Sequence, residues 1–553
     1  MTEAAAQPIA DAPATGFTAK MLDAVERLGN KVPHPVLMFL YLIIIVILLS
    51  AVLSFFDVSV TDQIAVPDAV EVVPDYYEDT TQPILEPGSD DLLYEDDWHI
   101  EEVTIPIESL LTTEGVRFIF TSFVPNFAGF GVVAVTFVAL MGAGVAEAGG
   151  LMGALIRGLV AASPRRLLSF ILILVGVLSS VASDAGYLIL IPLGAAAFLS
   201  VGRHPLAGMA ACFAGVAAIF GVNPIPGPID AMITEVTNEA LGLIPGAEPI
   251  TIVANYWFSV VSSLLLAVAA YFVTERIIEP RLGAYTGRPA GGGETQEIDR
   301  AAERRGLRRA GIALLAFVVL ILFLTIPEGS ALRDPETGNV IGNTPFMDSL
   351  LFIIAMAFLV SGIGFGYGAG TFKSATDVIA AVTKTFAGLA GLVFMLLMIS
   401  QFIAFFNYTN MPDVLGIALA EFLETAGIGA LPLLIGMILV ILLLDVIMPG
   451  LIPKWAIFAP ILVPLFVNLG VPAQTLLAAY RVGDSPLNTV TPLMVYLPFI
   501  VTIAQRYDPK AGIGTVIALM LPYVAIIAIT WIILFVAWFL LGLPLGPGYP
   551  VQI

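Results

Sequence analysis

Long apolar runs constrain the fold of this chain more than any other sequence feature. Residues 35–56 and 524–543 are almost wholly apolar, and each exceeds the roughly 18 residues that suggest a membrane-spanning helix. Hydrocarbon offers no partners to backbone N–H and C=O groups, so spanning segments must satisfy these groups internally. Of the 553 residues, 58% are hydrophobic and only 12% are charged. We therefore predict an all-α polytopic membrane protein.

Acidic residues are concentrated in one segment. Residues 57–112 contain sixteen Asp and Glu and no Lys or Arg, so without this segment the net charge would be −5 instead of −21. A block of like charges is most often solvated. We expect a solvated loop here, with attraction of cations or adaptation to high salt as the alternatives.

Basic residues indicate the orientation of the chain. Several precede the first apolar run, which places the N-terminal segment 1–34 in the cytoplasm by the positive-inside rule and the acidic loop outside. Residues 276–310 contain eight arginines and a run of glycines, which is typical of a cytoplasmic linker. This linker divides the chain into two halves, 35–275 and 311–553. A bacterial inner membrane is the expected location.

Each half contains the same two irregular features in the same order. Residues 167–200 form two apolar arms around the turn SDAG, and residues 431–470 form two arms around MPGLIPKW; both patterns predict a re-entrant helical hairpin. Residues 205–240 and 473–505 follow and are interrupted by GVNPIPGP and GDSPLNTVTP. Proline removes a backbone donor, so a broken helix is predicted at each interruption.

The order of these features predicts an inverted repeat. Counting spans through the linker makes the second hairpin enter from the opposite side to the first. Two halves of opposite topology with interrupted helices indicate a secondary transporter whose site lies near the bilayer midplane. We therefore predict an inverted-repeat transporter with about nine transmembrane helices, two re-entrant hairpins and two broken helices. The nine predicted spans are 35–56, 117–146, 205–240, 253–274, 311–325, 347–369, 378–407, 473–505 and 512–541.

The second helix break contains charged and polar side chains in apolar surroundings. Arg481 and Asp484 lie there with Ser485 and Asn488. A charge within the membrane costs about 2.5–3.5 kcal/mol on insertion scales and is a candidate functional group. Arg481 and Asp484 are three residues apart, so they share a helix face and could pair. Two readings are open: a structural pair that fixes the break, or direct contact with a substrate or coupling ion.

The two hairpins and the second break contain the stretches SSVASDAGYLILIPLGAAAFLSVGRHPLAGMAACFAGV (179–216), KWAIFAPILVPL (454–465) and AAYRVGDSPLNTVTPLM (478–494). These three stretches resemble the AbgT family, the p-aminobenzoyl-glutamate transporters. The resemblance covers nearly the whole chain. It implies nine transmembrane helices, two re-entrant hairpins and a dimer. It also implies import of p-aminobenzoyl-glutamate or export of sulfonamide antimetabolites.

The resemblance also implies site residues. Asp184 matches an aspartate at the first hairpin tip, where it is a candidate proton- or cation-linked group or, alternatively, a helix cap. Trp455 matches a tryptophan beside the second hairpin tip, where it would stack on an aromatic substrate or lie at a membrane interface. The implied substrate-binding residues are Asp184, Asn223, Trp455, Arg481, Asp484 and Pro492. The candidate coupling-ion or proton residues are Asp184, Asn223, Asp445, Asp484, Ser485 and Asn488, of which Asp445 departs from the family pattern.

The second hairpin departs from the family pattern. Asp445 stands where an asparagine is expected, and the apolar tip of residues 449–452 (PGLI) replaces an expected Gly-Ser-Ala-Ser. Hydroxyl groups are thereby lost and a potential negative charge is gained. Asp445 either strengthens proton coupling or pairs structurally with Lys454. Substrate identity therefore does not follow from the resemblance.

We predict an ion-coupled secondary transporter of small aromatic or anionic organic solutes, with elevator-like alternating access. A transporter of dicarboxylates or short-chain fatty acids is the first alternative. An intramembrane aspartyl protease, with Asp184 and Asp484 sharing a proton, is a remote one. We expect no enzymatic activity, no cofactor and no nucleic-acid partner. Expected partners are a small-molecule substrate, membrane lipid and a second copy of the chain, with Na⁺ or H⁺ as the coupling ion.

Overall fold

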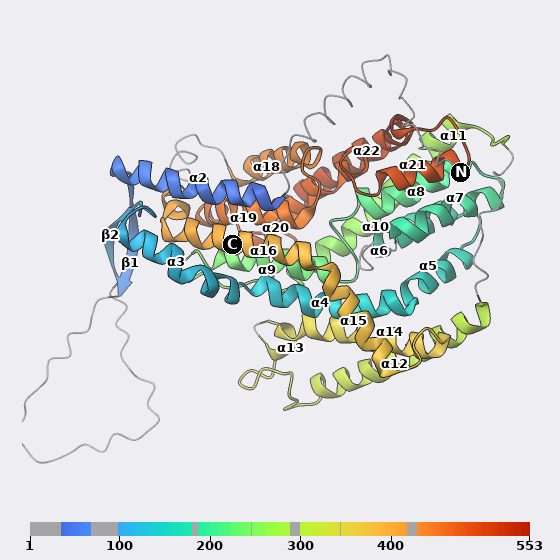
Figure 1. Ribbon diagram of the computed structural model, residues 1–553, viewed down its shortest axis with the longest axis horizontal. Helices are drawn as coiled ribbons and strands as arrows, with labels where there is room; N and C mark the ends of the chain where they lie inside the picture. Colours follow the sequence, from blue (N-terminus) through green and yellow to red (C-terminus); the bar gives the residue numbers. More distant parts are fainter. Residues whose placement is uncertain are drawn as a thin grey trace, which may run out of the picture.

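The chain folds almost entirely into helices (Figure 1). The computed structural model describes residues 35–67, 98–179, 186–244, 246–287, 299–342, 344–415, 417–418 and 429–552. In this part of the chain, eight helical segments are long and apolar enough to cross a membrane, if the consecutive helices α3 and α4 count as one. Seven of them correspond to predicted spans, and the eighth is the second arm of the second predicted hairpin.

The first half begins with a scaffold of long helices and continues into a hairpin and a broken helix. In chain order its helices are α2 (Pro35–Phe55), α3 (Thr113–Ala128), α4 (Gly131–Gly149), α5 (Leu151–Ala161), α6 (Leu168–Ser179), η2 (Gly186–Leu190), α7 (Ile191–Ser200), α8 (Pro205–Phe213), η3 (Ala214–Ala218), α9 (Pro228–Leu241), α10 (Tyr256–Val273), η4 (Thr274–Ile278) and α11 (Glu279–Leu282).

The second half follows the same plan. Its helices are α12 (Arg300–Thr325), α13 (Pro345–Asp348), α14 (Leu350–Ala369), α15 (Ala375–Gly388), α16 (Ala390–Tyr408), α18 (Ala430–Asp445), α19 (Leu451–Asn468), α20 (Ala473–Asp484), η5 (Pro486–Thr489), α21 (Leu497–Gln505) and α22 (Ile513–Leu540). In both halves a hairpin precedes a broken helix, and a long helix, α10 or α22, comes after it. The predicted order of hairpin and broken helix is thus confirmed.

Three predicted spans have different bounds in the structure. Helix α12 begins at Arg300 and not at 311, because Asp299 caps the backbone N–H groups of Ala301 and Ala302 and arginine and alanine are good helix formers. The span predicted at 117–146 is interrupted between α3 and α4. The span predicted at 378–407 is interrupted at Leu389, between α15 and α16.

The interruption between α3 and α4 is stabilised by a residue from elsewhere in the chain. The backbone N–H of Gly131 donates to Oε1 of Glu239 at 2.7 Å, and Glu239 lies near the end of α9. A carboxylate is a favourable partner at a helix N-terminus. The break therefore ties the scaffold to the broken helix of the first half.

The acidic segment contains two strands that the sequence did not predict. Strands β1 (Ser59–Pro67) and β2 (Trp98–Pro106) pair antiparallel, from Ser59 opposite Pro106 to Pro67 opposite Trp98. β-Branched residues such as Val60 and Thr104 favour this pairing. The acidic residues between the strands all lie outside the described part.

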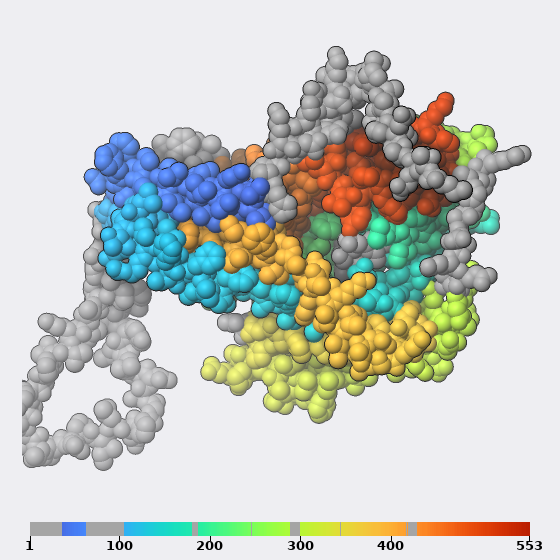
Figure 2. Space-filling view, in the orientation of Figure 1, coloured from blue at the N-terminus to red at the C-terminus, as the bar shows by residue number. Residues whose placement is uncertain are grey.

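The long helices outside the hairpins and broken helices, here called the scaffold, pack against one another. Helix α14 packs between α12 and α4, α2 packs against α16, and α15 contacts α4. In Figure 2 the segment from α12 to α14 forms the yellow-green layer at the bottom of the view, and the C-terminal helices form the red region at the upper right. Glycine permits the closest contact: a Cβ on Gly142 of α4 would lie 1.9 Å from the carbonyl oxygen of Ala355 on α14.

The hairpins and broken helices of the two halves interlock. In the second half α18 packs along α20, whereas α19 packs along α9 of the first half. In the first half α7 packs along α8, and η3 contacts both η5 and α22 of the second half. Each half therefore completes the irregular region of the other, and this brings the two helix breaks together.

Candidate functional site

The two helix breaks meet through direct hydrogen bonds. The backbone N–H of Gly221 in the first break donates to Oγ of Ser485 in the second break at 2.7 Å. In return, Nη1 of Arg481 donates to the carbonyl oxygen of Gly221 at 2.9 Å. Unwound backbone is tolerated at membrane depth only where its polar groups find partners. Here the freed groups of one break are held by side chains of the other.

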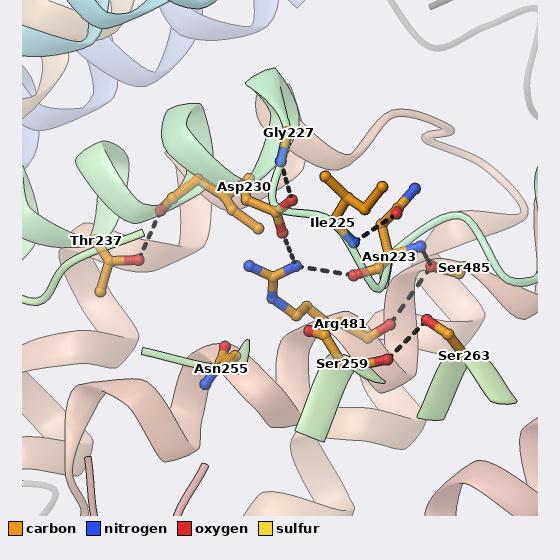
Figure 3. Close-up of polar contacts among 12 residues, drawn as sticks. Asn223, Ile225, Gly227, Asp230, Thr237, Asn255, Ser259, Ser263, Arg481 and Ser485 are labelled. Atoms are coloured by element: carbon orange, nitrogen blue, oxygen red, sulfur yellow. Dashed lines mark hydrogen bonds and ion pairs between the residues drawn. The ribbon is translucent and has the colours of Figure 1, made fainter. Parts of the chain in front are cut away.

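We call the place where the two helix breaks meet the crossing. Arg481 is its central charge. Its side chain is buried, and Nη1 lies 2.6 Å from Oδ1 of Asp230 (Figure 3). Oδ2 of Asp230 accepts the backbone N–H of Gly227 at 2.8 Å and so caps the start of α9. Nε of Arg481 is buried without a hydrogen-bond partner in the described part of the chain. The guanidinium therefore retains a donor beyond those used by the protein.

The structure does not form the pair of Arg481 with Asp484 that the sequence allowed as one of two readings. Asp484 lies on the same helix, but its Oδ1 is 2.7 Å from Nζ of Lys454, whereas Arg481 pairs with Asp230 on α9. Spacing on one helix shows only which side chains share a face. Each charge instead finds a partner on a different helix.

Lys454 joins two carboxylates of the second half. Its Nζ lies 2.6 Å from Oδ1 of Asp445 and 2.7 Å from Oδ1 of Asp484, and all three side chains are fully buried. The hydroxyl of Tyr480 donates to the carbonyl oxygen of Leu451 at 2.6 Å and lies 3.1 Å from the same Oδ1 of Asp484. Asp445 is thus paired with Lys454, as one of the two sequence readings expected.

Trp455 lies inside the protein and not at a membrane interface. Its side chain is fully buried, its Nε1 donates to Oγ1 of Thr237 at 2.9 Å, and its ring stacks on Tyr480 with centroids 4.3 Å apart. The ring thereby joins α19 to α9 and α20. In this conformation one aromatic face of Trp455 is already covered by Tyr480.

Two of the remaining predicted residues, Asn223 and Asn488, bond to backbone groups at or beside the breaks. Nδ2 of Asn223 donates to the carbonyl oxygen of Val177 on the first hairpin at 2.8 Å, and its Oδ1 accepts the N–H of Ile225 at 2.9 Å. Nδ2 of Asn488 donates to the carbonyl oxygen of Asp484 at 3.3 Å. Pro492 lies in the loop that leads to α21. Asp184 lies outside the described residues, so its role stays a prediction.

Sequence reasoning missed Asp230. The signal was present, because Gly227 and Pro228 end the first break and an acid three residues after a helix start is typical of a capping box. Its second role, as the partner of Arg481, joins residues 251 positions apart. Local patterns do not reveal such a pair.

The crossing is closed, but open space lies on the other side of α9. The cavity at the crossing, lined by Asn223, Asp230 and Arg481 among others, has a volume of about 10 Å³, roughly the space of one water. Two larger cavities of about 820 and 370 Å³ share Glu235 and Asn238 of α9 as lining residues. Helix α9 therefore separates the buried charges from this larger open space, called the vestibule below.

Each half of this mainly helical protein supplies a hairpin and a broken helix, and the two breaks meet around buried charges. This architecture is typical of a membrane transporter. The sequence model of the AbgT putative transporter family matches residues 20–553. The chain belongs to the AbgT family, which confirms the resemblance seen in its motifs.

Known relatives cover nearly the full length of the chain. The p-aminobenzoyl-glutamate transport protein of Escherichia coli (strain K12) is 31% identical over 539 residues, covering 97% of this chain and 98% of that protein. The crystal structure of the YdaH transporter of Alcanivorax borkumensis matches with 33% identity and a TM-score of 0.81, covering 93% of this chain and 100% of that one. The structure of MtrF of Neisseria gonorrhoeae, which is described as one of a class of antimetabolite efflux pumps, matches with 36% identity and a TM-score of 0.83. The match covers 96% of this chain and 100% of that one.

These relatives are transporters and not enzymes. The aspartyl protease alternative is therefore rejected. The geometry agrees, because Asp484 is engaged with Lys454 on the second hairpin. The inner-membrane location, the cytoplasmic N-terminus and the homodimer stay predictions.

Proposed function

We propose that this chain is an ion-coupled secondary transporter of small aromatic or anionic organic solutes. The candidate solutes are p-aminobenzoyl-glutamate, folate-related compounds and sulfonamides. The observation that carries the proposal is the buried guanidinium of Arg481, which lies at the crossing of the two breaks with Nε unbonded in the described part. Its planar fork suits a carboxylate or sulfonyl group better than an ammonium would.

The closed crossing implies that transport requires a conformational change. We propose that the hairpins and broken helices move as one unit against a dimerising scaffold formed by the remaining spans, as in an elevator. Two features support this division. The irregular helices of both halves interlock through α9 and α19, and the large vestibule lies between α9 and scaffold residues such as Val135 and Leu351.

A second candidate function is transport of dicarboxylates or short-chain fatty acids. The observation in its favour is the apolar tip of the second hairpin, where Leu451 is buried and uses only its backbone carbonyl to accept the hydroxyl of Tyr480. No side-chain hydroxyl is offered by residues 449–452. A solute that needs fewer hydrogen bonds would suit such a tip.

The proposal is tested by uptake into liposomes. Purified protein is reconstituted, and radiolabelled p-aminobenzoyl-glutamate uptake is measured under imposed sodium and proton gradients separately. Gradient-driven flux supports the proposed function. If this solute shows no flux, the same vesicles are tested with dicarboxylates and short-chain fatty acids. Failure with every class would contradict ion-coupled transport of small organic anions.

Asp184→Asn is expected to abolish gradient-driven flux while leaving the protein folded in membranes. The substitution keeps the size of the side chain and removes its charge at the expected first hairpin tip. Initial uptake rates in the same liposomes measure the effect, and size-exclusion profiles check folding. Wild-type flux in this variant would remove Asp184 from the site.

A further inference from the structure

Two helices of the second half end on the same buried lysine. Asp445 is the last residue of α18 and Asp484 is the last residue of α20, and Nζ of Lys454 pairs with one carboxylate oxygen of each. The C-terminus of a helix carries a partial negative charge and favours cations. Two carboxylates and two helix ends therefore converge on a point that a single ammonium group occupies.

The negative charge of this cluster exceeds the positive charge of Lys454. Oδ2 of Asp445 and Oδ2 of Asp484 are both buried and accept no hydrogen bond in the described part of the chain. Buried polar atoms normally have partners, and buried charges are costly unless they are paired. Without the ammonium group of Lys454, these two oxygens and the two that it holds would be available to a cation.

The ligand set suits a hard cation. Carboxylate oxygens are ligands that such ions prefer, and unwound helix ends hold sodium in transporters built from broken helices. Lys454 places one positive charge between the two carboxylates. A monovalent cation in the place of the ammonium group would keep the net charge of the cluster unchanged.

We propose that Lys454 is a tethered cation that fills a monovalent-cation site formed by Asp445 and Asp484, and that it makes this site independent of sodium. Asp445, present where the family pattern led us to expect an asparagine, is the residue that makes the site strong enough to hold a lysine in a dry interior. The proposal deepens the ion-coupled transport proposed above. What it says about the coupling ion rests on that proposed function. Binding itself is measured without transport.

The test is a sodium titration of the purified protein. Thermal unfolding of the wild type and of Lys454→Met is followed in NaCl, with choline chloride keeping the ionic strength constant. Removing the ammonium leaves two carboxylates unpaired, so Lys454→Met is expected to have a lower Tm in choline. Sodium is expected to raise that Tm by at least about 2 °C in a saturable manner, because a ligand stabilises the state that binds it. The wild type is expected to show no sodium-specific shift.

Matched variants separate the site from general effects. Lys384→Met makes the same substitution at an exposed lysine of α15 and is expected to show no sodium-specific shift. If Lys454→Met does not fold, Asp445→Asn/Lys454→Met keeps one carboxylate, restores the net charge of the wild-type cluster and is expected to show a weaker sodium shift.

Two outcomes would overturn the proposal. The first is an equal sodium-specific shift in wild type and Lys454→Met. The second is the absence of a sodium-specific shift from both Lys454→Met and the double variant. Because these readouts need no substrate, they stand apart from a failure of the liposome assay, which would contradict the transport function and not the cation site.

Discussion

Arg481→Ala is expected to abolish solute transport. The substitution removes the guanidinium that holds the carbonyl oxygen of Gly221 and the carboxylate of Asp230. Truncating one partner of a buried, hydrogen-bonded charge pair costs about 2–5 kcal/mol, and each 1.4 kcal/mol is tenfold in an equilibrium constant. Initial uptake rates in liposomes should therefore fall at least about 30-fold, to the background of empty vesicles.

A double variant separates the binding role of Arg481 from its structural role. In Arg481→Ala/Asp230→Asn the unpaired carboxylate is also removed, and the amide oxygen of asparagine can still accept the N–H of Gly227 at the start of α9. We expect this variant to recover thermal stability but not transport. Arg481→Lys keeps the charge without the planar fork and is expected to transport only weakly. Wild-type uptake by the double variant would show that Arg481 serves only to neutralise Asp230.

The irregular elements were predictable from sequence because their signals are local. Proline and glycine interrupt apolar runs at residues 221–228 and 483–492, and no continuous helix passes through either stretch. The hairpins follow from short apolar arms around a polar or glycine-containing turn. Hydropathy alone placed the start of helix α12 too late in the sequence. Its first turns are basic, so they are helical without being apolar.

The partners inside the site were not predictable in the same way. Asp230 with Arg481 and Trp455 with Thr237 each join residues more than 200 positions apart, and such pairs follow from the packing of α9 against the second half. For Asp445, sequence reasoning left pairing with Lys454 as one of two readings. The structure adds that Lys454 also binds Asp484, and this shared lysine is what suggests a cation site.

Gly221→Val is expected to separate the two helix breaks and to abolish transport, and Gly221→Ala should do so in part. A Cβ at Gly221 would lie 2.5 Å from Oγ of Ser485 and 3.0 Å from the carbonyl oxygen of Arg481. The serine hydroxyl can rotate away, but it then loses the hydrogen bond from the N–H of Gly221, and the backbone oxygen cannot rotate. Overpacking of this kind costs about 1–3 kcal/mol, which thermal unfolding of the purified variants measures beside their uptake rates.

The control for added volume is Gly391→Ala, where a Cβ meets no atom within 4 Å; alanine in a helix is expected to leave stability unchanged or to raise it. The compensating variant is Gly221→Ala/Ser485→Ala, which removes the nearest clashing atom and should recover part of the lost stability. Because it also removes the hydroxyl that accepts from residue 221, transport should remain below wild type. Full activity of Gly221→Val would contradict the view that transport depends on close contact between the two breaks.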